Sequence, residues 1–214
     1  MAITYRILDD YTVEVQNGDG SWSAPTLNAV EAKQFDDKVW RWAADALSNE
    51  ERTGLPAAFT LGVIEGESGG NPLAEGPPSD HGIGLMQITA TVLKQGLSDE
   101  EVFDPATNIR LGVDALAHSA SIVGYDLPKL ASMYNAGGGA GGPHPSVDAP
   151  WGYREYKTPQ GTYPYISRVV RTSNYAIQKM KATPPSTGFG IGLAVFLGSL
   201  FGLAVGAGIA LGRR

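Results

Sequence analysis

The feature that most restricts the fold of this chain is a long uncharged segment near its C-terminus. Residues 188–211 read GFGIGLAVFLGSLFGLAVGAGIAL and contain no acidic, basic or histidine side chain. A helix rises about 1.5 Å per residue, so such a segment would span roughly 36 Å, more than the hydrocarbon core of about 30 Å in a bilayer. We therefore predict a transmembrane helix over residues 188–211, separate from the fold of the preceding residues.

Small residues recur at every fourth position of this segment. They are Gly190, Ala194, Gly198, Gly202, Gly206 and Ala210. On a helix they form one stripe, and such a stripe lets membrane helices pack closely. We therefore expect the segment to self-associate or to pack on a helix of another membrane or virion protein. A plain anchor is the alternative.

The rest of the chain is long enough for one ordinary domain. The whole sequence has 214 residues, of which 43% are hydrophobic and 18% are charged, as is typical of a globular protein. A short linker with two consecutive prolines is predicted over residues 183–187, between this domain and the apolar segment.

The composition also argues against several classes of protein. The net charge is −6 and no basic patch is visible in the sequence, so a nucleic-acid partner is not expected. The absence of cysteine excludes disulfides, thiolate catalysis and thiolate–metal sites. His81, His118 and His144 are scattered, without the spacing of a zinc motif, so we expect neither a metal nor a cofactor.

The pattern of hydrophobic residues predicts a mainly α domain with a small β element in front of it. Residues 1–26 alternate β-branched and aromatic residues with turn signals, which indicates a β-hairpin or short meander. We call this element the N-terminal annex. It either packs as an edge on the main domain or docks a partner protein. The main domain is predicted over residues 27–182, with helices at residues 27–49, 57–67, 86–94, 108–122, 127–133 and 163–181, and with a long loop at residues 137–163.

One acidic residue stands out within this pattern. Glu67 ends an otherwise apolar helical stretch and is followed directly by a cluster of helix-breaking residues. Burial in an apolar cleft and the negative end of a helix would both raise the pKa of such a carboxyl. A carboxylic acid that stays protonated can donate a proton to a glycosidic oxygen. Glu65 lies two positions away, on a different helix face, and the pattern alone does not choose between the two.

Several short runs of residues decide between them by resemblance to a known family. The runs are ESGGNPLA at residues 67–74, GLMQI at residues 84–88, DPATNI at residues 104–109 with Gly112 one turn later, ASMYNAG at residues 131–137 and YISRV at residues 165–169. In this order they resemble the motifs of the soluble lytic transglycosylases, enzymes of the lysozyme-like superfamily that cleave peptidoglycan. The resemblance implies a lysozyme-like α+β fold and a peptidoglycan substrate.

The resemblance also implies roles for individual residues. Glu67 would be the single catalytic acid and then the base, and Ser68 would hold the helix end or the carboxylate by a hydrogen bond. The substrate-binding residues would be Ser68, Met86, Gln87, Tyr134, Asn135 and Tyr165. Core packing is the alternative for Met86 and Tyr134. Asn108 is expected to make helix or loop hydrogen bonds instead of contacting substrate.

The implied reaction needs only one carboxyl. Most glycosidases use two carboxylates, but some use a group of the substrate as the nucleophile. In lytic transglycosylases the N-acetyl group of the MurNAc residue assists departure of the GlcNAc leaving group at the β-1,4 bond. The ionised Glu67 would then deprotonate the C6 hydroxyl of the same MurNAc residue, which closes on C1 to give a 1,6-anhydro end without consuming water.

Three departures from the family pattern leave an alternative open. The segment between Pro72 and Gly84 is about two residues longer than usual, Gly161 stands where many members have a glutamate, and the loop at residues 137–163 is longer than average. Asp80 lies in the lengthened segment, where goose-type lysozymes carry an aspartate that positions water. With Asp80 as a second carboxylate, the enzyme would be an inverting muramidase. Thr89, however, stands where those lysozymes have a further aspartate.

The two ends of the chain suggest a biological setting. The N-terminus has neither the basic start nor the apolar core of a secretory signal peptide. A phage virion delivers its enzymes from outside the cell, so we expect a membrane-associated virion enzyme that opens the cell wall locally during phage genome entry. A membrane-anchored periplasmic enzyme of a bacterium is the alternative. A structural membrane-docking or tube-forming protein with a vestigial enzyme domain is a second class of function.

Overall fold

The computed structural model describes residues 3–78, 81–89, 91–135, 155–158 and 161–183. The chain divides into two compact units, Met1–Pro184 and Pro185–Arg214, and all described residues belong to the first. None of the helices within these ranges is both long enough and apolar enough to cross a membrane. The transmembrane helix predicted over residues 188–211 lies outside the described residues.

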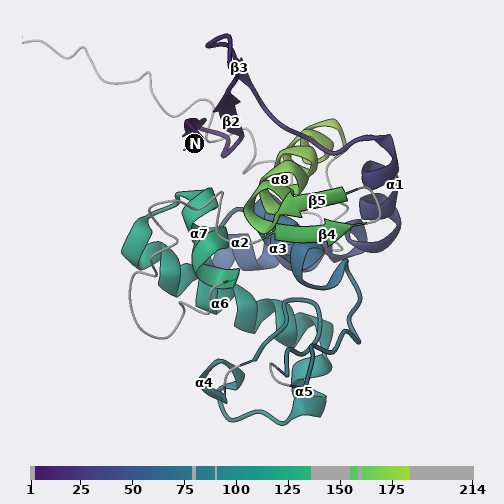
Figure 1. The fold of residues 1–214 in the computed structure, drawn as a ribbon. Helices are drawn as coiled ribbons and strands as arrows, with labels where there is room; N and C mark the ends of the chain where they lie inside the picture. Colours follow the sequence, from purple (N-terminus) through teal and green to yellow (C-terminus); the bar gives the residue numbers. More distant parts are fainter. Residues whose placement is uncertain (1–2, 79–80, 90, 136–154, 159–160, 184–214) are drawn as a thin grey trace, which may run out of the picture. The chain divides into compact units, whose positions relative to one another are not determined.

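The N-terminal annex is a three-stranded antiparallel meander (Figure 1). Its strands are β1 (Tyr5–Ile7), β2 (Val13–Gln16) and β3 (Trp22–Ser23), in the order β1-β2-β3. The β element predicted for these residues is therefore confirmed, with a short third strand added to the hairpin.

The annex is held on the last helix by a buried amide. Asn174 of α8 (Tyr165–Ala182) is only 1% exposed. Its Oδ1 accepts the Val13 N–H at 2.9 Å, and its Nδ2 donates to the carbonyls of Val13 at 2.9 Å and Pro25 at 2.8 Å. At another point the Tyr5 hydroxyl donates to the carboxylate of Asp126 at 2.9 Å. These contacts correspond to the packed-edge interpretation of the annex.

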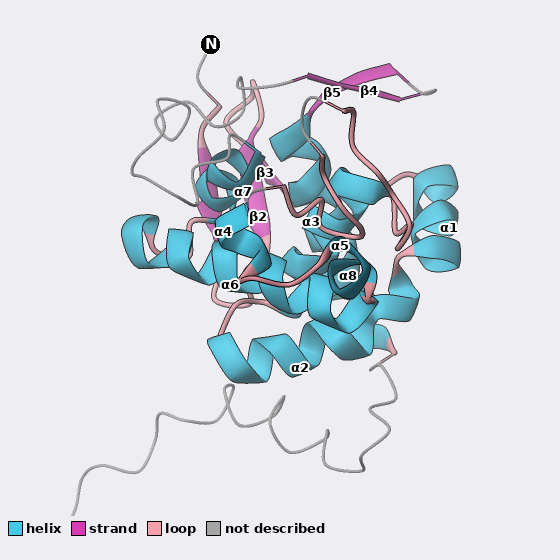
Figure 2. Ribbon diagram, turned by 90° about the horizontal axis from the view of Figure 1, so that it is seen from below, coloured by secondary structure: helices cyan, strands magenta, loops and turns pink. Residues whose placement is uncertain are grey.

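The main domain is built mainly of helices (Figures 1 and 2). The helices are α1 (Ala29–Lys38), the 3-10 turn η1 (Trp40–Trp42), α2 (Ala43–Thr53), α3 (Ala57–Ser68), α4 (Thr91–Lys94), α5 (Asp99–Phe103), α6 (Pro105–Val123), α7 (Leu127–Asn135) and α8. A separate antiparallel pair, β4 (Glu155–Thr158) and β5 (Gly161–Pro164), precedes α8. The predicted mainly α class is confirmed for the described residues.

Helix α3 packs against both α2 and α8. Nine of its twelve residues are buried, on every side of the helix, and it follows Pro56. An apolar helix of this kind is stable only inside a core. Its one polar end is the C-terminal turn that carries Glu65, Glu67 and Ser68, so the fold brings these side chains to the edge of the core.

Two predicted helices differ from the structure, one helix was not predicted, and β4 and most of β5 lie in the segment predicted as a loop over residues 137–163. The single helix expected over residues 27–49 is broken at Val39, where the η1 turn redirects the chain so that Arg41 and Trp42 reach the carbonyl of Gly70. The helix expected over residues 86–94 shrinks to α4 at its end. α5 was not predicted, although Ser98 and Glu101 form a capping box at its start, which is a sequence signal for a helix N-terminus.

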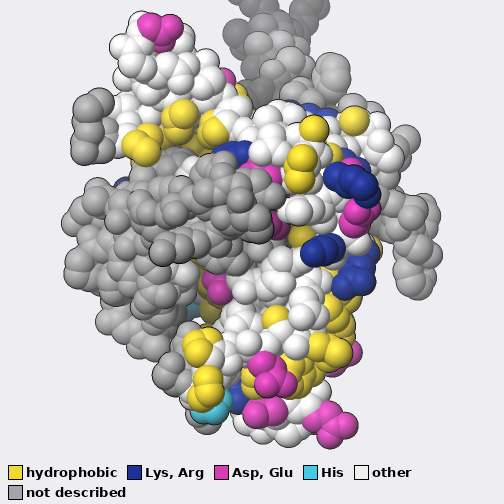
Figure 3. Space-filling view, turned by 45° about the vertical axis from the view of Figure 1, so that its right-hand side comes forward, with side chains coloured by type: hydrophobic (Ala, Val, Ile, Leu, Met, Phe, Trp, Pro, Cys, Tyr) yellow, Lys and Arg dark blue, Asp and Glu magenta, His cyan; other side chains and the backbone are white. Residues whose placement is uncertain are grey.

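Figure 3 shows one face of the described residues. On this face, Lys and Arg side chains lie beside Asp and Glu side chains.

We expect Asn174→Ala to lower the free energy of unfolding by roughly 2–4 kcal/mol, because it leaves the buried N–H and carbonyl of Val13 unpaired. Chemical denaturation of the two proteins measures the difference. Asn17→Ala is the matched control, since Asn17 makes its hydrogen bonds in an exposed turn of the same annex. Its effect should stay within about 0.5 kcal/mol. Equal stability of Asn174→Ala and the unmutated protein would show that the amide does not hold the annex.

Candidate active site

The C-terminal end of α3 is fixed by its own turn. Gly69 adopts the left-handed conformation with φ of 60°, and its N–H donates to the carbonyl of Glu65 at 3.0 Å. The Ser68 hydroxyl donates to the Ile64 carbonyl at 3.1 Å and accepts the Gly70 N–H at 3.2 Å. The expectation that Ser68 holds the helix end is therefore confirmed. Glu67 sits on a helix terminus whose backbone groups are bonded locally.

Two side chains of the η1 turn, which precedes α3, bind the segment that directly follows α3. The Gly70 carbonyl accepts hydrogen bonds from Arg41 Nη2 at 3.0 Å and Trp42 Nε1 at 3.2 Å. A Cβ at Gly70 would lie 2.5 Å from the Lys38 carbonyl oxygen, so only glycine fits against the end of α1. No motif in the sequence indicates this contact. The contacts of Gly70 fix the position at which the loop after Glu67 begins.

The Glu67 carboxylate is joined to the last helix. Tyr165, the first residue of α8, donates its hydroxyl hydrogen to Glu67 Oε1 at 2.5 Å, across 98 positions of sequence. Tyr165 is 2% exposed, whereas Glu67 is partly exposed. Burial, together with the neighbouring Glu67 carboxylate, raises the pKa of Tyr165 well above its usual range. The hydroxyl therefore stays protonated and keeps its role as a donor.

A second tyrosine approaches the same carboxylate from α7. Burial first, and then the charge of Glu67, raises the pKa of Tyr134 well above its usual range. Its hydroxyl donates to the Met86 carbonyl at 2.7 Å. The structure thus brings Glu67, Tyr134 and Tyr165 together from three helices, as the resemblance implied.

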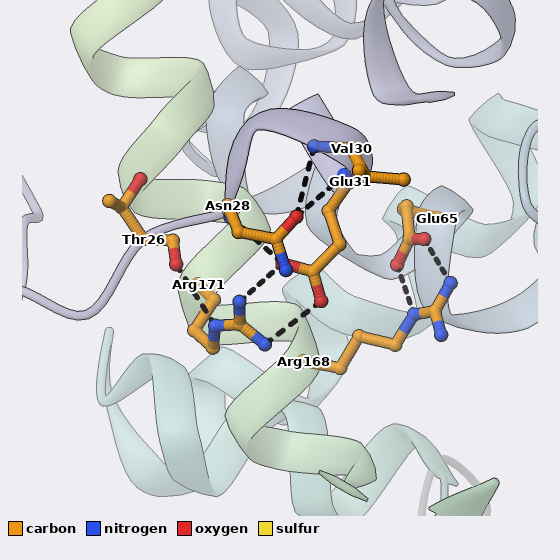
Figure 4. Close-up of polar contacts among 7 residues, drawn as sticks. All are labelled: Thr26, Asn28, Val30, Glu31, Glu65, Arg168 and Arg171. Carbon is orange, nitrogen blue, oxygen red and sulfur yellow. Dashed lines mark hydrogen bonds and ion pairs between the residues drawn. The ribbon is translucent and has the colours of Figure 1, made fainter. Parts of the chain in front are cut away.

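The neighbouring glutamate has a different role. Glu65 forms a two-pronged ion pair with Arg168 of α8, and the Arg168 Nε lies 2.5 Å from Glu65 Oε2 (Figure 4). Both side chains are mostly buried. Both oxygens of the Glu65 carboxylate are thus already bound by a guanidinium within the protein. The contacts therefore distinguish the two glutamates that the sequence pattern alone left equivalent.

Figure 4 also shows the second arginine of α8. Arg171 donates from Nε to the Thr26 carbonyl at 3.0 Å and pairs with Glu31. Glu31 also accepts the N–H of Asn28 at 2.8 Å, which completes the capping box of α1. This cluster joins α8 to the start of α1 and serves the fold, since each polar group in it already has a protein partner.

The loop at residues 83–88 is held by Asn108. Its Oδ1 accepts the Met86 N–H at 2.8 Å, and its Nδ2 donates to the carbonyls of Ile83 at 2.8 Å and Val102 at 2.9 Å. Asn108 is fully buried, and all these bonds go to backbone groups. The prediction that Asn108 makes loop hydrogen bonds is confirmed.

The side chain of Met86 packs in the core. It is fully buried, and a Cβ at Gly112 of α6 would lie 2.4 Å from its sulfur, so the thioether fills the space that this glycine leaves open. The burial favours the core-packing alternative for this side chain, and its substrate-binding role stays a prediction. The backbone carbonyl of Met86 accepts the hydrogen bond that orients Tyr134.

The side chain of Gln87 joins the two ends of the segment at residues 74–84. Gln87 adopts a positive φ of 48°, and its Nε2 donates to the carbonyls of Ala74 at 3.2 Å and Gly84 at 3.0 Å. A Cβ at Gly82 would lie 2.5 Å from Gln87 Oε1. The Gln87 amide thus holds Ala74 and Gly84 close together. The role of Gln87 in binding substrate stays a prediction.

Two further predicted site residues have different outcomes. Asn135, at the end of α7, has a buried Oδ1 with no hydrogen-bond partner among the described residues, and its role in binding substrate stays a prediction. Asp80, the possible second carboxylate, lies outside the described residues. Within the described part of the chain, no group of His, Asp and Glu side chains could hold a metal ion.

Comparison with known proteins agrees with this site. Residues 46–143 match the family model of the transglycosylase SLT domain, the family that the sequence motifs resemble. No curated protein matches the chain.

Two solved structures are similar to part of the chain. One is lytic transglycosylase Slt from Pseudomonas aeruginosa, with 21% identity over 67% of this chain and 25% of that one, and a TM-score of 0.47. The other is the 70 kDa soluble lytic transglycosylase from Escherichia coli, with 21% identity over 66% of this chain and 26% of that one, and a TM-score of 0.46. The matched region spans about a quarter of each of those longer proteins.

We expect Tyr165→Phe to raise the pKa of the Glu67 carboxyl. The hydroxyl donates to the carboxylate and so favours its ionised form, and removing this donor favours the protonated form. A ¹³C NMR titration of labelled glutamate side chains measures the change, with the Glu67 signal assigned by its loss in Glu67→Gln. Tyr175→Phe is the control, because the Tyr175 hydroxyl faces Asp36 on the surface. An unchanged or lowered Glu67 pKa in Tyr165→Phe would rule out the proposed hydrogen bond.

Proposed function

We propose that this chain is a peptidoglycan lytic transglycosylase in which Glu67 acts first as acid and then as base. The observation that carries the proposal is the pairing of a partly exposed carboxyl with the buried hydroxyl of Tyr165, while the only other acidic side chain of the same helix end, Glu65, is bound to Arg168. The match of residues 46–143 to the transglycosylase SLT domain supports the choice of substrate.

The reaction can be written with this one carboxyl. Protonated Glu67 gives its proton to the oxygen that links MurNAc to GlcNAc, and the bond from that oxygen to C1 of MurNAc breaks. The N-acetyl oxygen of the MurNAc residue forms a bond to C1 and takes the place of a protein nucleophile. Ionised Glu67 then takes the proton of the C6 hydroxyl, and the C6 oxygen displaces the N-acetyl oxygen from C1. The acid is regenerated, and the product ends in a 1,6-anhydro ring.

Tyr165 and Tyr134 serve Glu67 between these two steps. During this interval the carboxylate is negative, and the Tyr165 hydroxyl is already oriented toward it. A hydrogen bond to a charged group is worth about 1.5–3 kcal/mol. Tyr134, fixed by the Met86 carbonyl, packs beside the acid without reorganising. Asn135 follows it in the chain, and its Oδ1, which has no hydrogen-bond partner within the described residues, would accept an N–H of the sugar.

The first test compares the two glutamates. Glu67→Gln should reduce the release of soluble muropeptides from purified peptidoglycan by at least about a hundredfold, because the proton donor is lost. Glu65→Gln is the matched control: it should lower stability by breaking the ion pair with Arg168, while the activity of the folded fraction falls by less than about tenfold. Retention of lysis in Glu67→Gln would reject the proposal.

The products of the same digestion separate the two mechanisms. Mass spectrometry should find anhydro-muropeptides, each one water lighter than the corresponding reducing product. Reducing ends in their place would identify the alternative, an inverting muramidase that uses Glu67 together with Asp80.

The setting is proposed on the sequence alone. We propose that residues 188–211 attach the enzyme to a membrane and that it opens the cell wall locally during phage genome entry. The uncharged, membrane-length character of that segment supports the attachment. Flotation of the full chain with lipid vesicles tests the membrane attachment, with a variant lacking residues 185–214 as the control. Equal flotation of both proteins would reject the anchor.

Proteomic analysis of purified virions tests the phage setting. Absence of the chain from virions would reject the phage role.

A further inference from the structure

α3 carries Glu67 and α8 carries its partner Tyr165. These two helices contact each other at two glycines of α3. A Cβ at Gly62 of α3 would lie 2.4 Å from Ser173 Oγ and 2.7 Å from the Val169 carbonyl oxygen, and one at Gly66 would lie 2.9 Å from Tyr165 Cε2. Real Cβ atoms essentially never come this close to other atoms. The α3–α8 contact therefore depends on the absence of side chains at both positions.

The spacing of these residues explains the geometry. Gly62 and Gly66 are four residues apart and lie on one face of α3, while Tyr165, Val169 and Ser173 repeat at the same interval on α8. The side chains of α8 thus form a ridge that fits into a groove made by the two glycines. Gly62 faces the middle of α8, and Gly66 faces its first residue.

Gly66 touches the ring whose hydroxyl reaches the acid. It is the residue immediately before Glu67, and the Tyr165 ring lies over its Cα while the Tyr165 hydroxyl contacts Glu67 Oε1. We propose that Gly66 is a positioning residue: the missing side chain sets where the Tyr165 ring lies, and so sets the hydrogen bond to Glu67. The consequence for catalysis rests on the function proposed above.

The ring has little freedom to move aside. Tyr165 is 2% exposed and belongs to the central core, so a displaced ring would have to push on packed neighbours. Val169 limits the space as well, because its Cγ2 lies 3.2 Å from the same Cβ position. An added methyl group at Gly66 must therefore move the ring of Tyr165, the helix that carries it, or both.

The direction in which Gly66→Ala changes Tm tests whether an added methyl group collides with the Tyr165 ring. Alanine is a better helix former than glycine, so Gly66→Ala in an open position would raise Tm. A collision with the Tyr165 ring predicts a fall instead. In a Tyr165→Ala background the ring is gone, and the fall caused by Gly66→Ala should shrink or reverse. That comparison stays informative if Gly66→Ala alone folds poorly.

The main experiment is a double-mutant cycle on the full chain. Gly66→Ala, Tyr165→Phe and the double variant are compared by the initial rate of muropeptide release and by NMR titration of Glu67. We expect Gly66→Ala to reduce the rate about as much as Tyr165→Phe does, and to move the Glu67 pKa upward in the same way. In the Tyr165→Phe background, adding Gly66→Ala should change neither quantity further, because the hydroxyl is already absent.

The matched control is Gly62→Ala. It crowds the same helix contact one turn farther from Glu67, against Ser173 and Val169 instead of Tyr165. It should lower Tm while shifting the Glu67 pKa less than Gly66→Ala does. Equal pKa shifts from the two variants, or an unchanged Glu67 pKa in Gly66→Ala, would overturn the proposal. If the unmutated chain releases no muropeptides but Gly66→Ala still shifts the Glu67 pKa, the proposed function fails while the positioning role stands.

Discussion

The hydrogen bond between Glu67 and Tyr165 depends on how closely α3 and α8 can approach. Tyr165 is the first residue of α8 and Glu67 is the second-last of α3, so neither helix alone places the two groups. Because the contact runs through glycines, the distance between the helices is set by backbone atoms and short side chains instead of flexible ones. The relative position of Glu67 and Tyr165 is therefore held as firmly as the core in which the two helices pack.

α8 is also the element that joins the ends of the domain. Four of its polar residues, each three positions after the last, are Tyr165, Arg168, Arg171 and Asn174. They bind in turn the acid, its neighbouring glutamate, the start of α1 and strand β2. A helix in which every turn is tied to a different part of the chain cannot shift without breaking several buried bonds. The N-terminal annex thus takes part in holding the helix on which the acid's partner lies.

The sequence predicted the helices of the core well and some of the contacts poorly. α3 was predictable because an apolar run between a proline and a glycine cluster leaves few alternatives, and Glu67 followed from the motif after it. Gly112 belonged to a recognised motif, but periodicity cannot reveal that Met86 fills the space beside it. The break at Val39 could not be seen either, because its cause is Gly70, a residue far along the chain that is bound by Arg41 and Trp42. Local pattern predicts elements, whereas such pairings exist only once the fold is formed.

The contacts around Glu67 extend beyond the segment that matches the family model. The match covers residues 46–143, which includes Glu67, Tyr134 and Asn108. The donor to the acid comes from Tyr165, and the donors that fix Gly70 come from Arg41 and Trp42, all outside that range. The matched segment therefore contains Glu67, but the side chains that bind its carboxylate and hold the loop after it come from the flanks. A fragment cut to residues 46–143 would keep the motif and lose the geometry, because its apolar helix α3 would lie open along the face that α8 covers.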